Sequence, residues 1–84
     1  MGSYEFDGIT FRVYSGDHDP PHVHCRYQGI RVIVELGRDR TVRLAARPDA
    51  LRPTNAKKSH VRRILDLAGA HFDDLLRLWE EAHA

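Results

Sequence analysis

The chain has one cysteine, one methionine and only seven aromatic residues among its 84 residues. Cys25 has no second cysteine to pair with, which excludes an internal disulfide and leads us to expect a reducing, cytoplasmic location. No apolar run approaches the roughly 20 residues that a membrane-spanning helix needs. The N-terminus lacks a basic stretch followed by an apolar one, so we expect no secretory signal. What remains is one small domain, residues 1–84, with a single core.

The chain also lacks an overall excess of positive or negative charge, because its formal net charge is only +1. The charges are, however, unevenly distributed along the sequence. Residues 31–63 contain ten Lys or Arg against three Asp or Glu, whereas residues 64–84 contain one against five. The basic middle could bind a phosphate backbone or an acidic partner, or it could pair with the acidic segment of its own chain. It lacks interleaved aromatic residues, so a groove for stacking bases is not indicated.

Alternating apolar and polar residues predict a sheet over residues 4–45. Asp7-Gly8, between two alternating segments, predicts a hairpin turn because both turn positions need a positive φ. Short connections favour an antiparallel meander of about four strands. The side chains expected to face the core are Phe6, Ile9, Phe11, Val13, Val23, Cys25, Tyr27, Ile30, Val32, Val34, Leu36, Val42 and Leu44.

After a proline-bounded connector at residues 46–54, the apolar period changes to that of a helix over residues 55–83. The apolar stripe keeps one phase from Val61 to Trp79, which predicts a single long helix, kinked near Gly69. A break into two helices at residues 69–71 is the alternative.

Asn55 or Ser59 could cap the start of this helix. The predicted fold is therefore α+β: a small, curled antiparallel sheet with a C-terminal helix packed on one face.

The most informative motif is the stretch of residues 17–25, which brings three histidines together with two aspartates and a double proline. Pro20 and Pro21 cannot donate to a sheet, so we expect a strand to begin directly after them. On that strand His22 and His24 point to the same face, because side chains alternate. That face is rich in arginine.

Two chemistries suit this motif. In a metal site His22 and His24 would supply nitrogen ligands, and His18, Asp17 or Asp19 would supply a third ligand. In a metal-independent ribonuclease-like site one imidazole would accept a proton, the other would donate one, and arginine would stabilise the phosphate charge. The candidate metal ligands are thus His18, His22 and His24; the candidate catalytic residues are His22, His24, Arg26 and Tyr14; the candidate binding residues are Arg12, Arg31, Arg43, Pro20 and Pro21.

A purely structural interpretation also stays open. In it His22 hydrogen-bonds the preceding loop, His24 is an ordinary exposed strand residue, and the two aspartates accept local backbone hydrogen bonds. The remaining histidines, His60, His71 and His83, are expected at the surface, and Cys25 and Trp79 in the core.

The phrases Phe11-Arg12-Val13-Tyr14-Ser15, Asp19-Pro20-Pro21-His22-Val23-His24 and Leu75-Leu76-Arg77-Leu78-Trp79 resemble a family of small bacterial proteins, domain-of-unknown-function family 4160. The resemblance spans roughly residues 4–79, and Pro-Pro-His-x-His is its most specific part. It implies a stand-alone cytoplasmic protein whose gene often neighbours a second small gene, the pair being regarded as a toxin–antitoxin module. It supplies no catalytic residues.

We therefore expect one of three functions. The first is a growth-inhibiting toxin, paired with an antitoxin-like small protein and acting on RNA or another phosphate-bearing target through the His/Arg face. The second is a non-catalytic module that binds an acidic protein or nucleic acid. The third is a small metal-binding protein, in which a divalent metal would be the only cofactor.

Overall fold

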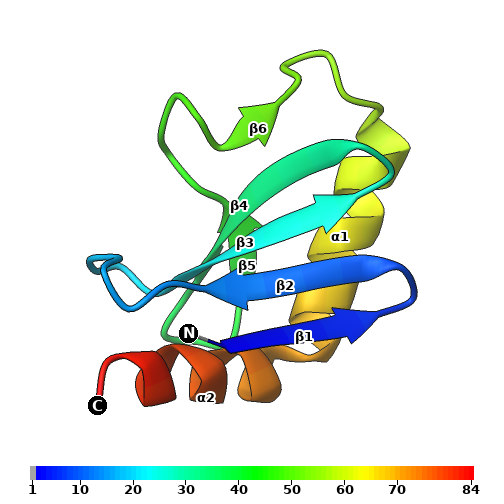
Figure 1. The fold of residues 1–84 in the computed structure, drawn as a ribbon. Helices are drawn as coiled ribbons and strands as arrows, with labels where there is room; N and C mark the ends of the chain where they lie inside the picture. Colours follow the sequence, from blue (N-terminus) through cyan, green and yellow to red (C-terminus); the bar gives the residue numbers. More distant parts are fainter. Residues whose placement is uncertain (1) are drawn as a thin grey trace.

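The computed structural model describes residues 2–84, which form six strands followed by two helices (Figure 1). The elements are β1 (Gly2–Phe6), β2 (Ile9–Val13), β3 (His22–Tyr27), β4 (Ile30–Leu36), β5 (Val42–Leu44), β6 (Leu51–Arg52), α1 (Lys58–Ala70) and α2 (Phe72–Ala82). The strands make one antiparallel sheet in the order β1-β2-β3-β4-β5, and β6 also pairs with β4. The predicted α+β class is confirmed.

Two tight turns set the register of the sheet. Asp7 and Gly8 have φ values of 49° and 80°, and Gln28 and Gly29 have φ values of 49° and 78°. Both pairs therefore adopt the positive φ that a two-residue hairpin turn needs. The first turn joins β1 to β2 and the second joins β3 to β4, so each strand keeps its apolar residues on the same face as its neighbour's.

The core lies between the sheet and the helices. Ile9, Phe11 and Val13 from β2 are fully buried, and they pack in one cluster with Ile64 and Leu75 from the helices. Most of the residues predicted to face inward belong to this cluster or pack against it. Leu44 is the exception: it lies on the short edge strand β5 and is 38% exposed.

The single long helix is wrong, and the alternative of a break is confirmed. α1 ends at Ala70 and α2 begins at Phe72, with His71 between them at φ −110° and ψ 27°. α1 packs on β3, β4 and β5, whereas α2 packs on β1, β2 and β3. The break lets each half follow a different part of the twisted sheet, while the apolar stripe continues through it.

The start of α1 also differs from the prediction. The helix begins after Lys57, and no side chain caps it, so neither Asn55 nor Ser59 has that role. The connector is not wholly irregular, because β6 lies within it.

Together β5 and β6 raise the strand number above four. The segment between them starts and ends beside Ile33 of β4, on the side of the sheet that the helices leave open. There Ala45 donates its N–H to the carbonyl of Ile33, and Ile33 donates to Ala50, each at 2.9 Å.

These three residues form a second, small apolar cluster on that face. None of the helices formed by residues 2–84 is long and apolar enough to cross a membrane.

Candidate functional site: an arginine hollow and an Asp-His-His trio

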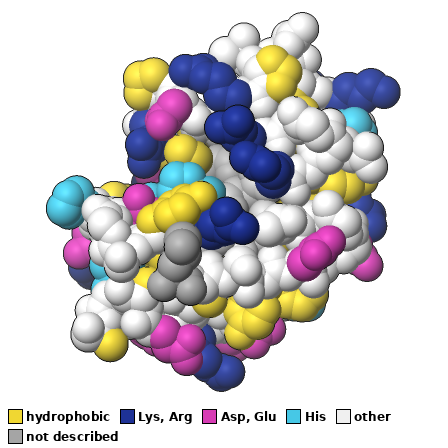
Figure 2. All heavy atoms as spheres, in the orientation of Figure 1, with side chains coloured by type: hydrophobic (Ala, Val, Ile, Leu, Met, Phe, Trp, Pro, Cys, Tyr) yellow, Lys and Arg dark blue, Asp and Glu magenta, His cyan; other side chains and the backbone are white. Residues whose placement is uncertain are grey.

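A row of arginines crosses the open face of the sheet. Arg26 of β3 lies directly opposite Arg31 of β4, and Arg31 lies opposite Arg52 of β6. Thr10 of β2 completes the row beside Arg26. Figure 2, which shows this face, has a band of Lys and Arg side chains across its middle. Directly opposite residues lie only about 5 Å apart at Cβ, so these like charges repel one another.

The neighbouring row holds Arg12 of β2 opposite His24 of β3. The ring of Tyr14 packs edge-on against His24, with 4.9 Å between the ring centroids. The two rows enclose a hollow of about 390 Å³, which we call the arginine hollow. Its lining residues are Thr10, Arg12, Tyr14, His24, Cys25, Arg26, Arg31, Val32, Ile33, Asp49 and Arg52.

The arginines of this hollow have few carboxylate partners within residues 2–84. Among residues 2–84, no ion pair engages Arg12, Arg26 or Arg31. Arg52 donates to the carbonyl oxygens of Pro48 and Leu51 rather than to a carboxylate.

The only acidic residue that lines the hollow in the described part of the chain is Asp49. It pairs with Arg47 at 2.6 Å, and the hydrogen bond from Arg47 lowers the pKa of this carboxyl. The hollow is therefore a strongly positive surface.

Several other arginines of the basic middle pair with nearby carboxylates. Arg40 pairs with Asp73 of α2 at 2.6 Å, and Arg43 pairs with Glu35 at 3.0 Å. The expectation that the basic middle meets the acidic C-terminal segment thus holds for Arg40. Arg43, a predicted binding residue, lies outside the arginine hollow.

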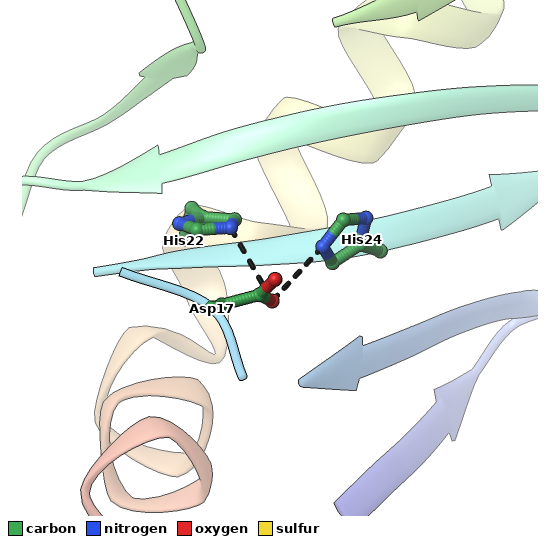
Figure 3. A group of neighbouring side chains, drawn as sticks. All are labelled: Asp17, His22 and His24. Atoms are coloured by element: carbon green, nitrogen blue, oxygen red, sulfur yellow. Dashed lines mark hydrogen bonds and ion pairs between the residues drawn. The ribbon is translucent and has the colours of Figure 1, made fainter. Parts of the chain in front are cut away.

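Asp17, His22 and His24 form a compact trio at the edge of the hollow (Figure 3). One carboxylate oxygen of Asp17, Oδ2, lies 3.0 Å from Nε2 of His24 and 3.4 Å from Nε2 of His22. Asp17 comes from the loop between β2 and β3, and the histidines come from β3. As predicted from the alternation, both imidazoles point to one side of the strand, and their ring centroids are 5.3 Å apart.

The two histidines differ in their surroundings. The His24 side chain is 31% exposed and donates a hydrogen bond from Nε2 to the Asp17 carboxylate, whereas His22 is only 5% exposed and packs against Trp79. Nδ1 of His22 donates a hydrogen bond to the carbonyl of Pro20 at 2.9 Å. Nε2 of His22 is buried and has no hydrogen-bond partner among residues 2–84. The structural interpretation is therefore correct for the loop contact of His22, but His24 is not an ordinary exposed residue.

The double proline acts through its carbonyl groups. Pro20 accepts the hydrogen bond from His22, and Pro21 accepts one from the N–H of Leu36 at 2.9 Å. β3 begins directly after Pro21, as predicted. His18 and Asp19 are exposed and lie outside the trio, so the aspartate that joins the histidines is Asp17.

His83 has a role that the sequence did not reveal. Its Nδ1 donates to the carbonyl of Trp79 and its Nε2 donates to the carbonyl of Asp17, each at 2.8 Å. Two carbonyl acceptors require both ring nitrogens to carry hydrogen, and these hydrogen bonds raise the pKa of His83. The side chain ties the end of α2 to the loop that presents Asp17. No periodic pattern could signal a contact between residues 66 positions apart.

The two other histidines pack against aromatic rings, and the cysteine lies in the core. His60 packs edge-on against Tyr27, and His71 stacks on Phe6 with 3.8 Å between ring centroids. Cys25 is buried, and burial raises the pKa of its thiol, so it is a core residue as predicted.

Comparisons with known proteins give one match. The family model described as "Domain of unknown function (DUF4160)" matches residues 8–80. No curated protein and no solved structure matches the chain.

Proposed function

The chain belongs to the DUF4160 family, and because that description assigns no activity, we propose a function from its own residues. The proposed function is to bind RNA by its phosphate backbone in the arginine hollow. The biological role proposed with it is that of a bacterial, cytoplasmic toxin in a two-gene module. The family resemblance supports that role, and the hollow supports the ligand.

The observation that carries this proposal is the cross-strand row Arg26, Arg31 and Arg52. Like charges directly opposite one another destabilise a sheet, and no carboxylate in the described residues 2–84 separates these three. Features that cost stability are expected where they serve a ligand. Guanidinium groups bind phosphate through paired, charge-assisted hydrogen bonds, so a phosphate placed over the row would relieve the repulsion.

The shape of the hollow favours a flexible single strand. A volume of about 390 Å³ lies within the range of small-ligand sites and suits a single nucleotide. Sequence-tolerant contact to single strands combines positive charge with an aromatic ring, which Tyr14 supplies at 38% exposure. An RNA loop or end can place its phosphates on the row and one base on this ring.

Of the predicted catalytic residues, His24, Arg26 and Tyr14 line the hollow, and His22 does not. Metal-independent cleavage by two imidazoles needs both rings to reach the substrate. With His22 5% exposed and held by Pro20, only His24 is in a position to do so. The proposed function is therefore binding, with His24 at the margin of the bound phosphate.

Binding of a fluorescently labelled single-stranded RNA, followed by anisotropy, tests the proposal. We expect Arg26→Thr and Arg31→Thr each to weaken binding by about tenfold, the equivalent of about 1.4 kcal/mol. Each should also flatten the dependence of affinity on salt, because one phosphate contact is lost. Arg62→Thr is the matched control, since Arg62 is exposed on α1, outside the hollow, and its loss should not matter.

Thermal melting of the same variants supplies a second readout. Arg31→Thr should melt no lower than the wild type, because it removes repulsion on both sides. Growth of cells expressing each variant shows whether toxicity follows RNA binding. Equal RNA affinity in the wild type and in both hollow variants would overturn the proposal. If the hollow variants instead lost the ability to bind an acidic protein, the binding-module alternative would be favoured.

A further inference from the structure

We propose that Asp17, His22 and His24 bind one first-row transition-metal dication, such as zinc. The ligand atoms are Oδ2 of Asp17 and Nε2 of each histidine, and they all lie within 4.8 Å of one another (Figure 3). This site goes beyond RNA binding and does not depend on it. Of the three loop residues that the sequence offered as a third ligand, Asp17 lies beside the histidines, whereas His18 of the candidate set does not.

The state of the His22 ring carries the inference. The carbonyl of Pro20 can only accept, so Nδ1 of His22 carries the hydrogen of that bond. In the neutral ring, Nε2 then carries no hydrogen and has an unshared electron pair. It is buried, it has no hydrogen-bond partner within residues 2–84, and it faces the Asp17 carboxylate at 3.4 Å. An electron pair held against a negative oxygen is unfavourable unless a proton or a metal ion lies between them, and the lack of a hydrogen bond at Nε2 favours the metal ion.

The hydrogen bond to Pro20 also matches what a metal-binding histidine needs. Such a histidine commonly donates its other ring N–H to a backbone carbonyl, which fixes the tautomer and aims the free nitrogen at the metal. The side chain of His22 is 7% exposed and packs against Trp79, so its orientation is fixed before any ion binds. A preoriented ligand loses little freedom on binding.

The two distances from the Asp17 carboxylate to the histidines fit a small dication. Ligand atoms bound to zinc at about 2.0–2.1 Å in a tetrahedron lie roughly 3.3 Å apart. The two distances from Asp17 Oδ2, 3.0 Å and 3.4 Å, bracket that value. Two imidazoles and one carboxylate are a ligand set for zinc, iron, cobalt or nickel rather than for calcium or magnesium. Three protein ligands leave the fourth position open to water.

The loop that supplies Asp17 is held in place from outside the trio. His83 donates to the backbone carbonyl of Asp17, and the N–H of Asp17 donates to the carbonyl of Tyr14 at 3.1 Å. Both backbone groups of Asp17 are thus engaged, and its carboxylate remains directed at the two histidines. The ligand therefore sits on a supported loop rather than on a free one.

Calorimetric titration of untagged, chelator-treated protein with Zn²⁺ alone tests the site. We expect one ion per chain for the wild type and at least a tenfold weaker affinity for Asp17→Asn and for His24→Ala. His18→Ala is the matched control, because His18 lies in the same loop outside the trio, and its affinity should equal that of the wild type. Zinc at a hundredfold excess over its Kd should raise the Tm by roughly 10–20 °C.

Two further readouts keep the test decisive. Asp17→Asn preserves the shape of the side chain, so circular dichroism should show a folded protein in which only the metal affinity has changed. Co²⁺ should give visible ligand-field absorption in the wild type and in His18→Ala but not in Asp17→Asn. Unchanged zinc affinity in Asp17→Asn and His24→Ala, or an equal loss in His18→Ala, would overturn the metal site; RNA anisotropy in excess chelator tests the hollow separately.

Discussion

At the scale of single residues, consecutive side chains of one strand alternate between the candidate binding surface and the core. On β3, Arg26 faces the open hollow and Cys25, its neighbour in sequence, is 2% exposed in the core. The same alternation places His24 at the hollow and Val23 in the core. One residue of slip in the register would bury the arginine and expose the thiol, so the tight turns that set the register also fix the candidate site.

Cys25 provides a prediction on pH and stability. Burial raises the pKa of its thiol, so the native protein keeps the thiol protonated while the unfolded chain ionises it near pH 8.5. The stability due to this difference is complete below that pH and is lost as the pH rises toward the folded pKa. We expect the wild type to lose up to about 1.4 kcal/mol per pH unit above roughly pH 8.5, relative to Cys25→Ala.

Urea unfolding of both proteins at pH 7, 8.5 and 10 measures this change. Effects of tyrosine and lysine titration are common to the two proteins and cancel in the difference. A difference in unfolding free energy that stays constant from pH 7 to pH 10 would show that Cys25 is ionised equally in both states.

At the scale of secondary-structure elements, the loops between the strands do as much as the strands to form the site. The loop between β2 and β3 supplies Asp17, and the segment between β5 and β6 supplies Asp49 to the rim of the hollow. The end of α2 holds the first of these loops through His83. Elements distant in sequence thus meet at one margin of the open face.

The tie made by His83 gives a prediction on local motion. Replacing His83 by Ala removes two hydrogen bonds, one to Trp79 and one to Asp17. We expect faster hydrogen exchange in the loop that carries Asp17 and in the last turn of α2, with little change in β2 and β4. Mass-spectrometric hydrogen exchange measures it, and His60→Ala is the control, because His60 packs against Tyr27 instead. Unaltered exchange in the loop would show that the hydrogen bond from His83 to Asp17 does not restrain the loop.

How far the sequence predicts these elements depends on the range of the interactions that form them. The strands and their turns followed from local alternation and from Asp7-Gly8, and the predicted core residues lie in the core apart from Leu44. The sequence does not signal β6, because its two residues form a strand only by pairing with β4. It offers the break at His71 only as an alternative, because the apolar stripe runs through it unchanged.

The site was predictable in part for the same reason. Alternation placed His22 and His24 on one side of β3, and the arginine-rich face followed from it. Which of three loop residues would join the histidines depends on the fold of the loop, which no periodicity encodes. The burial of His22 against Trp79 and the tie from His83 are likewise contacts across the whole molecule.

At the scale of the whole molecule, the sheet divides the protein into a face that builds the fold and a face that is free to bind. The helices cover the first face, where they pack on every long strand (Figure 1). The second face carries the arginine hollow and, at its margin, the Asp17 trio. Substitutions in the hollow should therefore change binding with little effect on folding, whereas those in the core should do the reverse.

Mapping a bound RNA by NMR tests this division most directly. In titrations of ¹⁵N-labelled protein with a short single-stranded RNA, we expect the largest shifts in β2, β3, β4 and β6 and in the guanidinium signals of Arg26 and Arg31. The helices should shift little. Shifts gathered instead around Arg38 and the basic start of α1, with the hollow unchanged, would contradict the account.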